Sequence, residues 1–337
     1  MSPLDLLDPT TTHDGRPKLG KVLSRSLGSA TIGCKSGHVI AGGPHEEAIV
    51  QFARVRRAAD RDVELVYRTP DDRLLPLASL DDSGNADPVA LLARTGRESL
   101  AEDIAALAAS TSAGDLLSVA EVLFEPPVAT CTKICCLALN YRDHAEESNL
   151  DVPPEPVLFF KPPSALTGHR TTVVAPRRTR HLEHEIELAV VIGTTTRDLP
   201  AERWTEAVAG YTVINDMTAR DLQLVNIARN VPWDQFKGFD TFAPLGPYLV
   251  TPDEVGDPSA LEMRLEVGGT VRQRANTAQM VYGLPRLIAD LSNGMTLLPG
   301  DVIATGTTAG LAPLVDGDVM RATIDRLGTL QNDVRFS

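Results

Sequence analysis

The sequence lacks the features that mark membrane-spanning and nucleic-acid-binding proteins. No stretch of its 337 residues approaches the roughly 18 consecutive apolar residues that a transmembrane helix needs. Basic residues number 32 against 45 acidic ones, which gives a formal net charge of −13. A nucleic-acid surface needs clustered Lys and Arg, and an anionic lipid surface attracts basic segments. We therefore expect neither nucleic acid nor a membrane as a partner.

Cysteine is also scarce, with four residues (Cys34, Cys131, Cys135 and Cys136) and no CxxC spacing. This usage disfavours a zinc site or a disulfide framework and favours reduced thiols that are buried as small apolar side chains. The N-terminus lacks the apolar core of a signal peptide, and its aspartates argue against a mitochondrial targeting segment. Reduced thiols without a targeting segment predict a cytoplasmic protein.

Three common catalytic loops are missing as well. The sequence has no GxGxxG dinucleotide loop, no GKS or GKT phosphate loop and no GxSxG nucleophile elbow. The glycine-rich segment 305–310 lacks the lysine that a phosphate loop requires. The chemistry of this chain therefore has to be sought in its acidic residues.

Hydrophobic patterning divides the chain into three parts. Residues 1–48 are polar and glycine-rich, and they predict an N-terminal extension. Residues 49–125 combine alternating segments with a helical pattern, which predicts a small α+β module. Residues 126–337 hold ten short strand candidates separated by turns. The predicted fold class is α+β and mostly β, with a rolled or barrel-like domain after the module.

Helical patterns occupy three segments. The first, 87–110, has leucines and an isoleucine among alanines. The second, 201–209, follows a proline, and the third, 278–291, carries apolar residues at helical spacing. We expect one helix over each segment.

The most informative segment is an acidic strand, Glu183–Gly193. Its second half is apolar and β-branched and ends in glycine, which is typical of a buried strand. Side chains two apart share a face, so Glu183, Glu185 and Glu187 are expected to point the same way. A hard divalent cation such as Mg²⁺ or Ca²⁺ would relieve their repulsion. The alternative is a solvated strand end whose glutamates face water.

A second acidic position, Asp216, ends the next strand candidate, 210–215. Loops that follow strands are where functional residues concentrate. Asp216 could complete an oxygen cage with Glu185 and Glu187 and leave positions open for a substrate. It could equally be the N-cap of a helix.

His144 and Glu147 form a third candidate. If their segment is helical, the two residues share a face. A carboxylate beside an imidazole orients it and raises its basicity, which suits the activation of water. The alternative is a surface helix with an ion pair.

Lys237 is the fourth candidate, because it lies among aromatic residues and glycines. It could place an ammonium group over a developing enolate, while Arg220 binds a carboxylate. The alternative is an exposed loop lysine. His184 falls on the opposite strand face from the glutamates, so we expect it to be packed and hydrogen-bonded rather than a metal ligand.

Six segments, taken in order, resemble the fumarylacetoacetate hydrolase superfamily. They cover about residues 130–335 and read KICCLALNYRDH, EPVLFFKP, HEIELAVVIG, GYTVINDMTARDLQ, KGFDTFAPLGP and PGDVIATGT. The HEIEL form resembles the acylpyruvase, oxaloacetate decarboxylase and fumarylpyruvate hydrolase branches. A few positions depart from the common pattern, among them Glu183, Ala138 and Thr308, which stands where a proline is usual.

The resemblance implies a mixed β-roll fold for a catalytic domain at residues 126–337, and a homodimer. It implies Mg²⁺ or Mn²⁺ held by three carboxylates: Glu185, Glu187 and Asp216. It also implies catalytic residues, partly on a mobile lid: His144, Glu147 and Lys237. The substrate contacts that it implies are Arg220, Gln223 and Thr277.

The residues and the resemblance together predict a metal-dependent hydrolase. Its partner would be a small 2-oxo acid, such as an acylpyruvate or fumarylpyruvate, whose carbon–carbon bond is cleaved by water activated at His144. Two alternatives use the same residues: an oxaloacetate decarboxylase and a 2-hydroxyhepta-2,4-dienedioate isomerase. A third is a catalytically silent protein that is stabilised by its metal.

Overall fold

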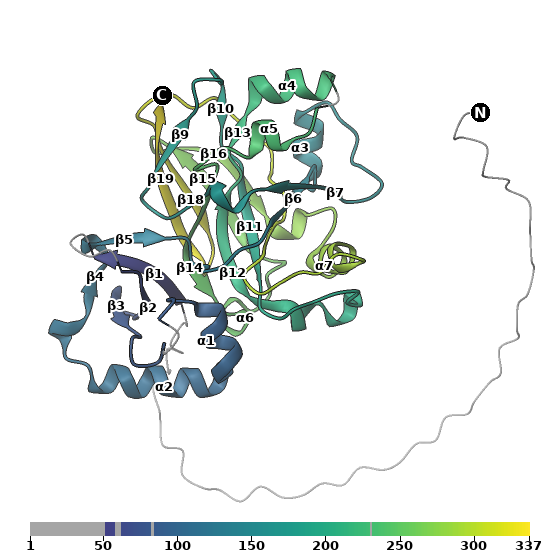
Figure 1. Ribbon diagram of the computed structural model, residues 1–337. Helices are drawn as coiled ribbons and strands as arrows, with labels where there is room; N and C mark the ends of the chain where they lie inside the picture. Colours follow the sequence, from purple (N-terminus) through teal and green to yellow (C-terminus); the bar gives the residue numbers. More distant parts are fainter. Residues whose placement is uncertain (1–50, 58–61, 82–83, 230) are drawn as a thin grey trace, which may run out of the picture. The chain divides into compact units, whose positions relative to one another are not determined.

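The computed structural model in Figure 1 describes residues 51–57, 62–81, 84–229 and 231–337. These residues belong to one unit, which extends from Glu47 to Ser337. The predicted extension over 1–48 and Cys34 lie outside the described residues, so both interpretations stay predictions. No helix among the described residues combines the length and apolar character needed to cross a bilayer.

Strand β11 (Ile186–Ile192) is buried along its whole length and separates two hydrophobic cores. Because side chains alternate along a strand, Leu188 and Val190 face one core while Ala189 and Val191 face the other. This explains why residues 188–192 are continuously apolar rather than alternating.

A large mixed sheet is built around β11. Its strands, in spatial order, are β4 (Leu117–Ser118), β3 (Arg73–Pro76), β2 (Glu64–Arg68), β1 (Gln51–Arg57), β14 (Ala243–Val250), β12 (Val208–Asn215), β11, β17 (Val302–Ala304), β6 (Ile134–Ala138) and β7 (Val157–Lys161). Two further strands join from the side: β5 (Val122–Glu125) pairs with β1, and β8 (Leu166–Thr167) pairs with β14. The sheet is open, with β4 and β7 at its ends, so the described residues form no closed barrel.

A five-stranded sheet and a short two-stranded sheet complete the β structure. The five strands, in spatial order, are β16 (Thr270–Asn276), β15 (Glu262–Val267), β18 (Val319–Ile324), β19 (Gly328–Phe336) and β9 (Thr172–Ala175). The two-stranded sheet pairs β10 (Leu182–Glu183) with β13 (Thr218–Ala219). Short turns at Gly268-Gly269 and Leu327-Gly328 join β15 to β16 and β18 to β19 as hairpins.

The α-helices are short and lie outside the sheets. They are α1 (Pro88–Thr95), α2 (Arg97–Ser110), α3 (Arg142–Glu147), α4 (Arg220–Ala228), α5 (Asp234–Lys237), α6 (Pro252–Val255) and α7 (Leu284–Ser292). The 3-10 helices are η1 (Ala113–Asp115), η2 (Val119–Glu121), η3 (Pro163–Ala165), η4 (Ala201–Ala207) and η5 (Thr277–Gln279). Figure 1 shows α3, α4 and α5 gathered near β10 and β13, which places them beside the ends of β11 and β12.

The three helix predictions each need correction. The segment 87–110 forms two helices, because Gly96 adopts a φ of +77° that interrupts the helical path. The segment 201–209 is the 3-10 helix η4, and its last two residues already belong to β12. The third helix begins only at Leu284, because Asn276 caps η5 and Met280 bridges to Tyr141 instead of continuing a helix.

The large sheet crosses the boundary that the sequence placed at residue 125. Strand β1 pairs with β5 on one side of this boundary and with β14 on the other. The two predicted parts thus share one sheet. Their division into a module at 49–125 and a catalytic domain at 126–337 stays a prediction. Cys135 and Cys136 are buried free thiols that face different cores, and Cys131 is half-buried and free, as expected.

Candidate metal centre and active site

Three carboxylates converge where β11 begins and β12 ends. Strands β11 and β12 are antiparallel, with Ile186 opposite Asn215, so Glu185 and Asp216 lie side by side just beyond the ladder. The backbone N–H of Asp216 donates a 2.8 Å hydrogen bond to the carbonyl of Glu185. One oxygen from each of Glu185, Glu187 and Asp216 lies within 4.8 Å of the other two. The expected convergence of these three side chains is therefore present.

Glu183 does not share this cluster, contrary to the expectation of a common face. It belongs to β10, and the chain leaves the ladder at His184 and Glu185 before β11 begins. The side chain of Asn215 accepts the backbone N–H of Glu185 at 2.8 Å, which fixes this break. Glu183 instead accepts a 2.6 Å hydrogen bond from Nε of Arg220.

Two lysines and an arginine compensate most of the buried negative charge. Nζ of Lys237 lies 2.6 Å from Oε2 of Glu185 and 2.6 Å from Oδ2 of Asp216. Lys161 pairs with the other oxygen of Asp216, and Nη2 of Arg220 lies 2.8 Å from Oε1 of Glu185. Burial opposes the ionisation of Glu185, but Lys237 and Arg220 outweigh it and hold its pKa well below the usual range.

Glu187 is the exception among the three carboxylates. Its Oε2 accepts a 2.7 Å hydrogen bond from the backbone N–H of Gly306. Within the described part of the chain, no cationic side chain forms an ion pair with it. Burial and the neighbouring charges of Asp216 and Glu185 raise its pKa well above the usual value. A divalent cation fits this set, because carboxylate oxygens are its preferred ligands and Glu187 lacks a positive partner.

The predicted dyad lies on helix α3. His144 is 8% exposed, and its Nδ1 lies 3.7 Å from Oε2 of Glu147, which is longer than a hydrogen bond. Burial lowers the pKa of His144, so its imidazole is neutral near pH 7 and able to accept a proton. Catalytic hydrogen bonds are often long in the absence of substrate and tighten when it binds.

The loop after β17 holds this helix. The hydroxyl of Thr308 donates a 2.6 Å hydrogen bond to Asp143, and the backbone N–H of Gly310 donates one of 3.0 Å to Glu147. The same loop supplies Gly306 to Glu187. One segment therefore positions both the dyad and a metal ligand.

The two remaining predicted substrate contacts lie in different places. Gln223, on α4, lines the cavity, and its Oε1 accepts a hydrogen bond from Nη1 of Arg220. Thr277 is buried elsewhere: its hydroxyl donates to the carbonyl of Pro258 at 2.8 Å and accepts from the N–H of Leu261 at 2.9 Å. The structure does not bring Thr277 to the site, and we withdraw it from the proposed substrate contacts.

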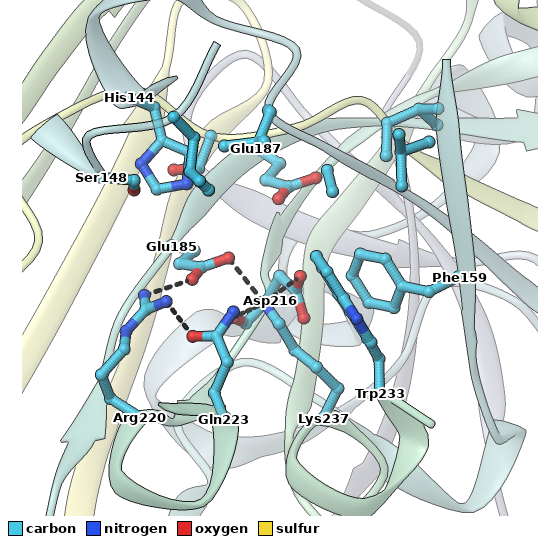
Figure 2. Close-up of a pocket in the computed structure, with 16 residues that line it drawn as sticks. His144, Ser148, Phe159, Glu185, Glu187, Asp216, Arg220, Gln223, Trp233 and Lys237 are labelled. Atoms are coloured by element: carbon cyan, nitrogen blue, oxygen red, sulfur yellow. Dashed lines mark hydrogen bonds and ion pairs between the residues drawn. The ribbon is translucent and has the colours of Figure 1, made fainter. Parts of the chain in front are cut away.

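A cavity of about 190 Å³ joins these residues. Figure 2 shows the carboxylates of Glu185, Glu187 and Asp216 between His144 on one side and Lys237 on the other. The rings of Phe159 and Trp233 lie beside Lys237. Drug-sized ligands occupy pockets of roughly 300 to 1,000 Å³, so this cavity suits a smaller molecule.

Sequence reasoning missed two residues that shape the site. Lys161 is 1% exposed and ends β7, where a lysine after an apolar run was the available signal. Thr218 donates a 2.9 Å hydrogen bond to Oε1 of Glu185, and nothing in the sequence marked it. The interpretation of His184 is confirmed, because its Nδ1 lies 2.9 Å from Oε1 of Gln273 and its side chain is fully buried.

Residues 133–335 match the protein family described as fumarylacetoacetate (FAA) hydrolase, C-terminal. Over 243 residues, 68% of this chain and 84% of the relative, the sequence is 44% identical to 2,4-didehydro-3-deoxy-L-rhamnonate hydrolase of Sphingomonas sp. (strain SKA58). It is 34% identical to maleylpyruvate hydrolase from Sphingobium sp. SYK-6, solved with manganese(II) ion and pyruvate. The match covers 85% of this chain and 99% of the maleylpyruvate hydrolase chain, with a TM-score of 0.70.

A solved isomerase is similar as well. The 5-carboxymethyl-2-hydroxymuconate delta-isomerase from Mycobacterium smegmatis is 34% identical to this chain, with a TM-score of 0.66. The match covers 86% of this chain and 99% of the isomerase. The fold is thus similar to those of both a hydrolase and an isomerase.

Proposed function

Because the chain belongs to the fumarylacetoacetate hydrolase family, we propose that it is a metal-dependent hydrolase that cleaves a carbon–carbon bond of a 2-oxo acid. One observation carries the proposal: Glu187 is a buried carboxylate with no cationic partner among the described residues, and Glu185 and Asp216 lie beside it. A buried charge of this kind is costly unless a cation neutralises it.

The three carboxylates would hold Mg²⁺ or Mn²⁺. Manganese is supported by the maleylpyruvate hydrolase structure, which was solved with that ion. When bound, the cation supplies Lewis-acid polarisation of the 2-oxo acid. Ca²⁺ also accepts carboxylate oxygens and is a further candidate for the same three ligands.

The side chains around the carboxylates have complementary tasks. His144 takes a proton from the water that attacks the distal carbonyl carbon, and Glu147 stabilises the imidazolium that results. When the carbon–carbon bond breaks, its electron pair moves onto the pyruvyl oxygen. The ammonium of Lys237 donates to this oxygen as it gains charge. Return of the proton to the pyruvyl carbon then yields pyruvate and a carboxylic acid.

Arg220 and Gln223 would orient the carboxylate end of the substrate. Both line the cavity beside Glu185, and they hydrogen-bond to one another. Their mutual bond fixes the guanidinium plane, and a planar fork suits a carboxylate.

A panel of 2-oxo acids with Mg²⁺ and Mn²⁺, read by pyruvate release, tests the reaction. We expect cleavage of at least one acylpyruvate or fumarylpyruvate, and loss of this activity in His144→Ala with metal binding retained. Oxaloacetate decarboxylation needs no attacking water, so it would survive His144→Ala. Absence of pyruvate from every acid, with metal bound, would overturn the proposal.

Isomerisation of an unsaturated 2-oxo dioate is a second candidate, because the similar Mycobacterium smegmatis protein is named as an isomerase. It requires only proton transfer between carbons. A shift in the ultraviolet spectrum of the dioate without pyruvate release would favour it over hydrolysis.

We also propose a homodimer in the cytoplasm. Strand β7 is an end strand of the large sheet, and its Leu158 and Phe160 are exposed apolar side chains that a second copy could cover. The buried free thiols suit a reducing compartment. Light scattering after size-exclusion chromatography would give the mass of a dimer or contradict it.

A further inference from the structure

We propose that the cavity selects 2-oxo acids whose far end is apolar and uncharged, and that it discriminates against dicarboxylic acids of equal length. This inference rests on the proposed function, because it assumes that the 2-oxo acid end lies at the three carboxylates. It concerns the apolar lining of the same cavity, against which the rest of the substrate would pack.

Much of the cavity lining is apolar, and we call this part the apolar wall. It comprises six side chains: Leu137, Leu139, Leu150, Val157, Phe159 and Trp233. The rings of Phe159 and Trp233 pack with their centroids 5.1 Å apart and their planes inclined at 40°, which makes part of the wall aromatic. An alkyl or aryl tail gains free energy by leaving water for such a wall. A carboxylate there would lose its hydration without a partner.

The cationic side chains of the cavity are already engaged. Among the described lining residues, only Arg220 and Lys237 carry a permanent positive charge. Nε and Nη2 of Arg220 donate to Glu183 and Glu185. Lys237 donates to Glu185 and Asp216. Nζ of Lys237 lies 5.3 Å from the centroid of the Phe159 ring, but its hydrogen bonds to Glu185 and Asp216 already engage its charge, so no unengaged cation awaits a second substrate carboxylate.

The groove outside the cavity reinforces this discrimination. It shares Leu150 and Arg220 with the cavity and adds the carboxylates of Glu147 and Glu183. Its other additions are apolar, namely Leu224 and Leu311. A longer tail that enters this groove meets the carboxylates of Glu147 and Glu183, apolar surface and one cation, Arg220, that already pairs with Glu183 and Glu185. This surrounding favours an alkyl end over an anionic end.

The charge balance of the site leads to the same conclusion. Four carboxylates (Glu183, Glu185, Glu187 and Asp216) face three cationic side chains (Lys161, Lys237 and Arg220). With a divalent cation the site carries one net positive charge. A substrate with one carboxylate neutralises it, whereas a dicarboxylate leaves an excess negative charge in a largely buried space.

The experiment compares two acylpyruvates of equal chain length that end in either a methyl group or a carboxylate. We expect kcat/KM of the wild-type protein with Mn²⁺ to be at least about tenfold higher for the methyl-ended acid. Calorimetric titration of His144→Ala, which lacks the proposed base, should show the same preference in Kd. Equal values or a preference for the dicarboxylate would overturn the inference while leaving the proposed function intact.

A charge-introducing variant tests the location of the tail. Leu150 is 54% exposed and lines the cavity, so Leu150→Arg adds a cation there without burying it. We expect it to raise the dicarboxylate-to-methyl ratio of kcat/KM at least about tenfold. Leu123→Arg is the matched control, because Leu123 is 51% exposed on β5 and lines neither the cavity nor its groove. An unchanged ratio in Leu150→Arg would contradict the placement.

Failure of the wild type to release pyruvate from either acid would instead count against the proposed function.

Discussion

The hydroxyl of Thr308 donates a 2.6 Å hydrogen bond to the carboxylate of Asp143 and so joins the loop after β17 to helix α3. Asp143 also accepts the backbone N–H of His144 at 2.8 Å. A residue outside the catalytic groups therefore fixes the helix that carries the proposed base. Proline, which the family resemblance would place at position 308, has no hydroxyl and could not form this bond.

Thr308→Val should lower turnover without weakening metal binding. Loss of one hydrogen bond costs about 1 kcal/mol, which corresponds to a roughly fivefold fall in kcat if it acts wholly on the position of His144. Steady-state kinetics and Mn²⁺ titration measure the two effects separately. Thr323→Val is the control, because its hydroxyl bonds to Thr329 on the five-stranded sheet. Unchanged kcat in Thr308→Val would contradict the positioning role.

Lys237→Met should abolish turnover and strengthen metal binding. The ammonium lies 2.6 Å from both Glu185 and Asp216 and competes with a cation for their oxygens. The same ammonium is the proposed donor to the developing negative charge, and loss of such a donor costs about 100- to 1,000-fold in kcat. Calorimetry with Mn²⁺ and pyruvate release are the measurements. Weaker Mn²⁺ binding in Lys237→Met would show that the lysine assists the cation rather than competing with it.

Lys161→Met should destabilise the protein strongly. Lys161 and Asp216 are both fully buried, and removal of one partner of such a pair costs about 3 to 5 kcal/mol of unfolding free energy. Urea denaturation of the metal-free protein measures this cost. Arg203→Met breaks an ion pair with Glu206 in which both side chains are exposed, and it should have little effect. Equal effects of the two substitutions would refute the proposed importance of the Lys161 pair.

His169 should make stability depend on pH between about 4 and 6.5. Burial lowers the pKa of His169 to about 4, and its Nδ1 accepts the backbone N–H of Gln331 at 3.0 Å. The unfolded chain takes up a proton near pH 6.5, whereas the folded protein resists protonation until about pH 4. Stability is therefore complete above pH 6.5 and declines as the pH falls through this window, by up to about 3 kcal/mol.

His169→Asn removes the titrating imidazole, while the Oδ1 atom of asparagine keeps a hydrogen-bond acceptor near the position of Nδ1. We expect the fall in unfolding free energy between pH 6.5 and 4.5 to be smaller in the variant than in the wild type. Urea denaturation at several pH values gives both curves. Parallel curves would mean that other groups cause the decline.

The local chemistry of the site could be predicted, because it follows from strand alternation. Glu185 and Glu187 are two apart, and Asp216 ends the neighbouring strand, so their convergence needed only the pairing of β11 with β12. The same patterning and the matched segments predicted a mostly-β fold of the fumarylacetoacetate hydrolase type. The observed sheets and the solved neighbours confirm it.

The errors arose where contacts distant in sequence decide the structure. The family resemblance implied Thr277 as a substrate contact, but its hydroxyl is bonded to Pro258 and Leu261. The helix expected from 278 begins at Leu284 because Met280 bridges to Tyr141, 139 residues before it in the chain. Lys161 was overlooked because only the folded structure places Asp216 beside it. Periodicity contains no information about such partners.

The most direct test of the account is a calorimetric Mn²⁺ titration of metal-stripped wild type and Glu187→Gln. We predict about one Mn²⁺ per chain for the wild type and at least about a 100-fold weaker affinity for Glu187→Gln, because the variant removes a ligand charge. The metal-free variant should unfold at about the same urea concentration as the wild type, because the raised pKa of Glu187 favours its uncharged form when no cation is bound. No Mn²⁺ binding by the wild type, or undiminished binding by Glu187→Gln, would contradict the proposal that these carboxylates form a metal site.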